Sequence, residues 1–316
     1  MIELYKKRNL SDYFNDTIAF FKATGKHFFK NYFIVNGPFL LLLSFLMYVI
    51  MKVYVETLFG LMINPAASQP AVIINLFYDN AVLYISVLLV FVLLTLFLSL
   101  MSLTYPVIYV QLMERHGGND FTTAAIIAEL RLNLGRMFVF LAGLVFIIVP
   151  VLMILFTLLF FLTFILIGIP MLVVALPAAM SWIALSYHDY VIRRCGFFEA
   201  LGQGFRMLRQ KFWTIVGTTF LMMLMLQILQ GILTMVPYVI GIILLFTSAQ
   251  AVDFSDPDFI PVVAVYMAAL MVFAVIVSYF FNNFLILCQG LMYYSSREDN
   301  EHKATQHQIE TIGTAL

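Results

Sequence analysis

The stretch from Leu83 to Met101, LYISVLLVFVLLTLFLSLM, contains no charged residue. A helix of about 20 apolar residues is long enough to cross the hydrocarbon core of a bilayer. The strands of a transmembrane β-barrel instead alternate apolar and polar residues over about ten positions. The stretch from Leu40 to Ile50 is also almost continuously apolar. These two stretches predict an integral membrane protein built from helices.

The composition agrees with this prediction. Of the 316 residues, 63% are hydrophobic and only 11% are charged, and the mean hydropathy is +0.99. A soluble domain carries about 25% charged residues. The formal net charge is zero, so no nucleic-acid partner is expected. The first long apolar run starts near Phe33 and no small-residue cleavage site follows it, which does not fit a cleavable signal peptide.

Six membrane spans are expected, several of them longer than the ~20 residues that a bilayer requires. Their approximate bounds are Tyr32–Tyr54, Ala81–Met113, Met137–Phe161, Ile169–Tyr190, Phe212–Pro237 and Pro261–Tyr294. If the N-terminus is cytoplasmic, all of the 17 lysines and arginines except Lys52 fall on the cytoplasmic side. This is the bias that the positive-inside rule describes. Both termini are therefore predicted to lie in the cytoplasm.

A small pattern occurs three times, each time directly before a long apolar segment. Phenylalanines recur every seven positions at Phe14, Phe21 and Phe28 and at Phe198, Phe205 and Phe212, and a fainter copy has Thr123, Leu130 and Met137. The cations that accompany them are Lys22, Lys26, Arg131, Arg136, Arg206, Arg209 and Lys211. Seven residues make about two helical turns, so each set forms one stripe. A basic helix with an aromatic edge is typical of a helix that lies on a membrane surface.

We therefore expect an all-α membrane protein with six transmembrane helices in three repeats, each repeat consisting of a cytoplasmic amphipathic helix and a helical hairpin. The repeats cover 11–114, 115–194 and 195–297, after a cytoplasmic N-terminus at 1–10. The tail at 298–316 is polar and is predicted to be disordered. Repeats of two spans each are parallel in topology, unlike those of inverted-repeat transporters. The outer connections Val55–Asn80 and Tyr238–Ile260 leave room for a surface helix or a re-entrant segment.

No charged residue lies in the middle of a span, which argues against a proton pump or a channel with a charged filter. The spans do contain amides, which commonly form hydrogen bonds between membrane helices. These amides are Asn36, Gln111, Gln227, Gln230, Asn282, Asn283 and Gln289. Asn282 and Asn283 are adjacent, where the other returning spans carry Pro106 and Pro177. They are the candidates for a polar gap or hinge.

Signals for catalysis are sparse. His188 and Asp189 lie together at the inner end of the fourth span, where a histidine and a carboxylate could perform acid–base chemistry. No nucleophile or metal-ligand spacing accompanies them, so a juxtamembrane ion-pair cluster beside Arg193 and Arg194 is the favoured interpretation. The two cysteines fit neither a disulfide in a reducing compartment nor a metal site. We therefore expect no enzymatic activity, cofactor or metal.

The segment from Phe197-Phe198-Glu199-Ala200-Leu201 through Lys211-Phe212-Trp213 resembles a group of bacterial multi-span proteins that includes the glycerophosphoryl diester phosphodiesterase membrane domain. The resemblance extends over the hydrophobic region and implies a bacterial inner-membrane location. The catalytic domain of the namesake enzymes is a separate soluble barrel with no counterpart here, so no active-site residue is carried over. The richness in Phe and Tyr also resembles Bacteroidota-type proteins whose relatives accompany MoxR-type AAA ATPases and von Willebrand-type adaptors. That implies a subunit of a cell-envelope complex.

Three hypotheses about function remain open. The first is a non-catalytic scaffold whose basic helices anchor the chain to the phospholipid bilayer or dock soluble partners and other membrane subunits. The second is a transporter of lipid or another amphiphile, which the amides within an apolar bundle would serve. The third is an intramembrane enzyme acting near His188 and Asp189.

Overall fold

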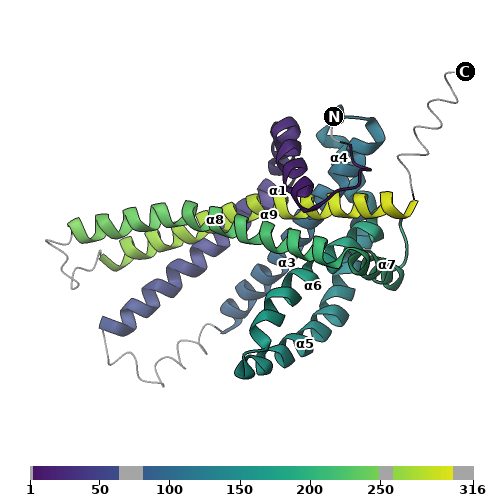
Figure 1. The fold of residues 1–316 in the computed structure, drawn as a ribbon. Helices are drawn as coiled ribbons and strands as arrows, with labels where there is room; N and C mark the ends of the chain where they lie inside the picture. The colour runs from purple at the N-terminus through teal and green to yellow at the C-terminus, as the bar shows by residue number, and fades with distance from the viewer. Residues whose placement is uncertain (1–2, 64–80, 249–258, 302–316) are drawn as a thin grey trace, which may run out of the picture. The chain divides into compact units, whose positions relative to one another are not determined.

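A computed structural model describes residues 3–63, 81–248 and 259–301, and nearly all of them are helical (Figure 1). The helices are α1 (Leu10–Ile63), α3 (Ala81–His116), α4 (Thr123–Gly143), α5 (Val149–Leu162), α6 (Gly168–Ile192), α7 (Phe197–Gln210), α8 (Phe212–Ser248) and α9 (Phe259–Glu301). A π-helical turn at Leu144–Ile148 joins α4 to α5, and a 3₁₀ turn at Thr163–Ile165 follows α5.

The prediction of six helical spans is confirmed. Six helical segments are long and apolar enough to cross a membrane, namely Leu10–Val55, Ala81–His116, Thr123–Ile165, Gly168–Ile192, Phe212–Ile243 and Pro261–Asp299. Their mean hydropathy over the best window ranges from 1.9 to 3.1. By helix length and hydropathy, the chain is a multi-pass membrane protein.

Several of these helices are much longer than a bilayer is thick. The segments that begin at Leu10 and Thr123 contain 46 and 43 residues. At 1.5 Å per residue, each is roughly 65 Å long, about twice the ~30 Å thickness of the hydrocarbon core. About half of each helix therefore extends beyond the apolar layer, and the basic stretches of the sequence lie in these extensions.

The first two basic stretches are not separate helices. Helix α1 runs from Leu10 to Ile63 without a break and passes through Pro38, and α4 continues into α5 through the π turn. Membrane helices tolerate proline because neighbouring groups satisfy the backbone that it frees. In the third stretch, Lys211 leaves the helical conformation, with φ −128° and ψ 44°, and separates α7 from α8.

Most of the outer connections (64–80 and 249–258) and the tail after Glu301 lie outside the described residues. The first part of the connection Tyr238–Ile260, expected above to leave room for a surface helix or re-entrant segment, instead continues α8, which ends at Ser248. Pro237 does not end that helix.

The chain forms two compact units. Unit 1 comprises 1–35, 102–226 and 282–316, and unit 2 comprises 36–101 and 227–281. Within the described residues, every lysine and arginine except Lys52 belongs to unit 1. The three repeats remain a prediction from the sequence.

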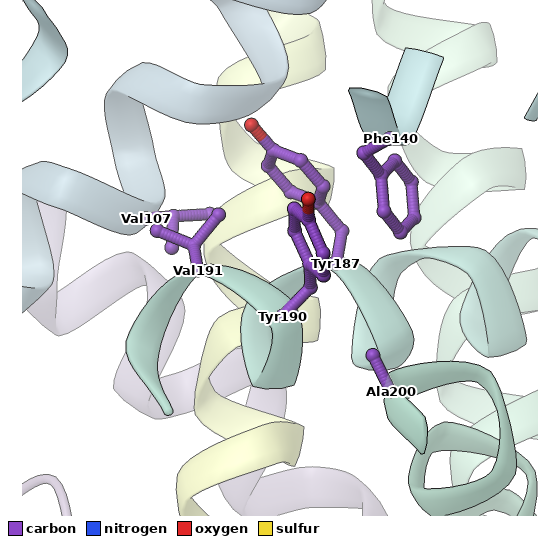
Figure 2. Packing of buried hydrophobic residues seen from close by; sticks show 6 residues of the cluster. All are labelled: Val107, Phe140, Tyr187, Tyr190, Val191 and Ala200. Atoms are coloured by element: carbon purple, nitrogen blue, oxygen red, sulfur yellow. The ribbon is translucent and has the colours of Figure 1, made fainter. Parts of the chain in front are cut away.

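A buried cluster joins four helices within unit 1 (Figure 2). Its members are Val107 of α3, Phe140 of α4, Tyr187, Tyr190 and Val191 of α6, and Ala200 of α7. The ring of Phe140 meets the ring of Tyr187 edge to face, with 4.8 Å between the centroids. The Tyr187 hydroxyl is hydrogen-bonded to Thr104 of α3. Because no member is more than 4% exposed, this cluster fixes the basic helices α4 and α7 to the ends of α3 and α6.

Candidate functional site

Unit 1 contains a polar bundle, which we define as Leu10–Val35 of α1, Ser102–His116 of α3, α4, Ser181–Ile192 of α6, α7 and Asn282–Asp299 of α9. Its interior differs from the apolar surfaces of the spans because large tyrosine side chains fill it. Those less than 2% exposed are Tyr13, Tyr32, Tyr105, Tyr109, Tyr187, Tyr293 and Tyr294. A buried tyrosine contributes a large apolar ring but still needs a partner for its hydroxyl.

Asp189 lies at a junction between α6, α9 and the turn that leads to α7. Its carboxylate is fully buried. One oxygen, Oδ1, accepts a hydrogen bond from the Tyr293 hydroxyl at 3.1 Å. The other, Oδ2, lies 3.2 Å from the Arg193 guanidinium and 3.5 Å from the Cys195 sulfur. This carboxylate therefore connects three segments of the chain.

His188 is enclosed in the same region and is 2% exposed. Its Nδ1 lies 2.8 Å from the Ala184 carbonyl oxygen, and because a carbonyl only accepts, Nδ1 carries the proton. The imidazole stacks against the Tyr293 ring, with 5.7 Å between centroids. His188 and Asp189 both contact Tyr293, and the side chain of each is engaged by neighbouring groups within the chain.

Burial raises the pKa of the Cys195 thiol to about 11, and the negative charge of Asp189 acts in the same direction. The thiol is therefore protonated at neutral pH and can donate to Asp189. Because the thiolate is the nucleophilic form of cysteine, this site is a poor nucleophile.

The other carboxylates of the polar bundle are also bonded within the chain. The contacts are Tyr5 and Tyr294 with Glu114 at 2.8 and 3.0 Å, Arg115 and Arg194 with Glu129 at 3.4 and 3.7 Å, Arg8 and Lys6 with Asp16 at 2.8 and 3.6 Å, and Lys211 with Asp299. Many of these join segments that are far apart in sequence. These acids therefore have partners within the chain, although Glu114 itself is exposed.

Several cations, in contrast, are exposed and form no ion pair with any residue that the structure describes. They are Lys22, Lys26 and Lys30 of α1, Arg131 of α4, and Arg206 and Arg209 of α7. Because the acids of the bundle have partners within the chain and these cations have no ion-pair partner among the described residues, the unpaired charge on the described surface of the bundle is mainly positive.

Two of the predicted docking residues, Arg136 and Lys211, instead bond to other segments of the chain. Arg136 donates from Nη2 to the carbonyl oxygens of Tyr190 and Cys195 at 2.7 and 2.8 Å, and its guanidinium carbon lies 4.2 Å from the centre of the Tyr190 ring. Lys211 pairs with Asp299 of α9. The remaining five, Lys22, Lys26, Arg131, Arg206 and Arg209, are exposed, and their role in docking stays a prediction.

The three aromatic or apolar stripes differ in how they are covered, whereas the sequence predicted three like surface helices. Phe28 in the first is completely buried against Tyr105 and Tyr109 of α3, with centroids 5.1 and 4.8 Å apart. In the third, Phe198 and Phe205 are 71% and 55% exposed. Only tertiary neighbours produce this difference, since the spacing is the same in both.

The structure places the candidate gap residues on an unbroken helix. Helix α9 continues through Asn282 and Asn283, and the boundary between the two units falls between Phe281 and Asn282. Asn283 is buried and Asn282 is exposed. Whether they form a gap or hinge stays a prediction.

A different amide stands out in unit 2. Asn36 is fully buried, and neither its amide nitrogen nor its amide oxygen has a hydrogen-bond partner among the described residues. Ser44, two turns later on α1, is also buried, and its hydroxyl likewise lacks a partner there. The sequence showed the amide but gave no sign that it would be buried without a partner.

Comparisons with protein-family models, curated proteins and solved structures found no match to this chain. The resemblance to the phosphodiesterase membrane domain therefore rests on the sequence pattern alone.

Proposed function

We propose that this chain is a non-catalytic scaffold subunit of a cell-envelope complex in the bacterial inner membrane. The observation that carries the proposal is the distribution of charge in the polar bundle. Its acids bond internally, while Lys22, Lys26 and Arg131 remain exposed and without an acidic partner in the described part of the chain. An acidic surface on a partner protein is complementary to such a face.

The placement of cations supports the proposed orientation. All described lysines and arginines but Lys52 belong to unit 1, the unit that contains the polar bundle. Positively charged residues accumulate on the cytoplasmic side of membrane proteins. We therefore place the polar bundle and both termini at the cytoplasmic face, together with the basic helices of the three proposed repeats.

The partner that the sequence resemblance favours is a soluble component of a MoxR-type ATPase system. Contact through α1 and α4 would leave the buried Asp189 junction undisturbed, because that carboxylate is bonded to Tyr293 and Arg193. The same enclosure gives no support to an enzyme that uses His188 and Asp189, and we do not propose one.

A comparison between a variant that removes charge and one that conserves it tests the scaffold proposal. The variant Lys22→Gln/Lys26→Gln/Arg131→Gln is expected to lose co-purifying proteins by about threefold to a hundredfold, since each of the three exposed charge pairs contributes roughly 0.2–1 kcal/mol. The control Lys22→Arg/Lys26→Arg/Arg131→Lys keeps the charge and should retain them. The measurement is quantitative mass spectrometry of the tagged chain, purified in mild detergent from native expression levels. A wild-type chain that elutes alone as a monomer, or equal retention by both variants, would contradict the proposal.

Asn36 supports a second candidate, a carrier of lipid or another amphiphile. A buried amide without a partner costs about 1–3 kcal/mol, a cost that a polar cargo would relieve. In Asn36→Leu, a carrier should lose transport of fluorescent phospholipid in liposomes, while the thermal stability stays equal or rises. Unchanged transport in that variant and in Asn282→Leu/Asn283→Leu would argue against the carrier.

A further inference from the structure

Helix α7 has two apolar faces, and the protein covers only one of them. Ala200, Leu201, Gly204, Met207 and Leu208 are buried on the covered side. Beside the covered side, the rings of Phe198 and Phe205 are exposed, although the Phe205 ring also meets the Trp182 ring of α6 edge to face, with 6.4 Å between the centroids. The indole of Trp213 follows at the start of α8. Trp213 is 74% exposed, although its side chain is large and aromatic.

The covered face holds α7 in one orientation. The Trp182 indole nitrogen of α6 donates to the Leu201 carbonyl at 3.0 Å. A Cβ added at Gly204 would lie 2.7 Å from the backbone nitrogen of Ser186, so the two helix backbones are in close contact. At Gly202, on the other side, a Cβ would meet no atom within 4 Å. The exposed rings therefore cannot turn inward without breaking this contact.

The position of α7 in the chain decides what can cover these rings. The helix lies between two membrane spans, the first ending at Ile192 and the second beginning at Phe212. Both ends of α7 are thus held near a boundary between water and lipid. Aromatic side chains favour the headgroup region of a bilayer, where a helix with a basic polar face binds.

The charges beside the rings specify the kind of lipid. Arg206 and Arg209 are exposed on α7 and form no ion pair with a residue in 3–63, 81–248 or 259–301. Each cation near a membrane surface attracts anionic lipid by about 1 kcal/mol. On α1, by contrast, Lys22 and Lys26 belong to a helix whose Phe28 is buried against α3.

We propose that α7 and Trp213 form a binding site for anionic phospholipid. Phe205 and Trp213 enter the boundary between headgroups and acyl chains, and Arg206 and Arg209 contact the lipid phosphates. This inference rests on the membrane placement within the proposed function. It does not depend on α1 and α4 docking a partner, so the two proposals fail in different experiments.

Fluorescence quenching of the full-length protein in liposomes tests the site. The chain has two tryptophans, so Trp182→Phe leaves Trp213 as the reporter. The liposomes are phosphatidylcholine with an equal fraction of either brominated phosphatidylglycerol or brominated phosphatidylcholine. We expect the brominated phosphatidylglycerol to quench more strongly. If Trp182→Phe does not fold, the difference between wild type and Trp213→Phe gives the same signal.

The matched pair of charge variants decides the outcome. Arg206→Gln/Arg209→Gln should lower the preference for phosphatidylglycerol by roughly fivefold for each cation removed. Lys22→Gln/Lys26→Gln removes the same charge and should leave the preference unchanged. Equal quenching by the two lipids, or an equal loss in both variants, would overturn the proposal. Quenching by aqueous iodide but by neither lipid would show that the face is not in the membrane and would also overturn it.

Discussion

The substitution Gly204→Ala is expected to lower the free energy of unfolding by about 2–3 kcal/mol, near the upper end for overpacking. The new Cβ would lie 2.7 and 2.9 Å from the backbone nitrogen and Cα of Ser186 and closer still to its hydroxyl. Backbone atoms within a helix cannot move aside as a flexible side chain can. Helix α7 must therefore shift away from α6, which also weakens the hydrogen bond from Trp182 to Leu201.

Gly202→Ala is the matched control, two residues earlier on the same helix. A Cβ there meets nothing within 4 Å, and the residue is exposed. Alanine is favoured over glycine in a helix by about 0.5–1 kcal/mol, so this variant should be slightly more stable than wild type. Thermal unfolding in detergent, followed by circular dichroism, measures both. Shifts of the midpoint in the same direction would contradict the close packing of α7 on α6.

The spans were predictable because the bilayer imposes a local rule. The run from Leu83 to Met101 needs no knowledge of any neighbour to be recognised as a membrane helix. The structure confirms it within α3, together with the other five candidate spans. The lengths of α1 and of α4 with α5 were harder to predict. Hydropathy marks the apolar part, but whether the basic extension continues the same helix depends on packing.

The coverage of the aromatic stripes could not be predicted from their spacing. A stripe of period seven fits a protein core as well as a lipid surface. Phe28 is buried by Tyr105 and Tyr109, which lie far from it along the chain. Phe205 has the same spacing but remains 55% exposed, because its ring has only an edge contact with the Trp182 ring of α6, with 6.4 Å between the centroids.

For the candidate polar residues too, the sequence predicted some features and not others. His188 and Asp189 could be recognised as a pair in the sequence, but the contact of Asp189 with Tyr293, more than a hundred positions away, could not. Likewise, Arg131 and Arg136 look alike in the sequence, because both are arginines on one basic helix. In the structure Arg131 is exposed and Arg136 is half-buried. Only the position of the α6–α7 turn shows that Arg136 is bonded to Tyr190 and Cys195.

Asp189→Ala is expected to lower the free energy of unfolding by about 2–4 kcal/mol. The buried Tyr293 hydroxyl would lose its acceptor, which costs roughly 1–3 kcal/mol, and Arg193 would lose a buried partner. The loss falls short of that for a fully buried ion pair because Arg193 is 38% exposed and can turn toward water. Asp189→Asn keeps an acceptor oxygen and should be less harmful.

Glu199→Ala provides the comparison, because Glu199 is the second acid that pairs with Arg193. Its side chain is 54% exposed and its oxygen lies 3.5 Å from the guanidinium. Exposed pairs contribute little, so the loss should not exceed about 0.5–1 kcal/mol. Unfolding in detergent, measured for the three variants under one condition, separates the two acids. Equal losses for Asp189→Ala and Glu199→Ala would mean that Arg193 pairing alone matters, and that the Tyr293 contact does not hold α6 to α9.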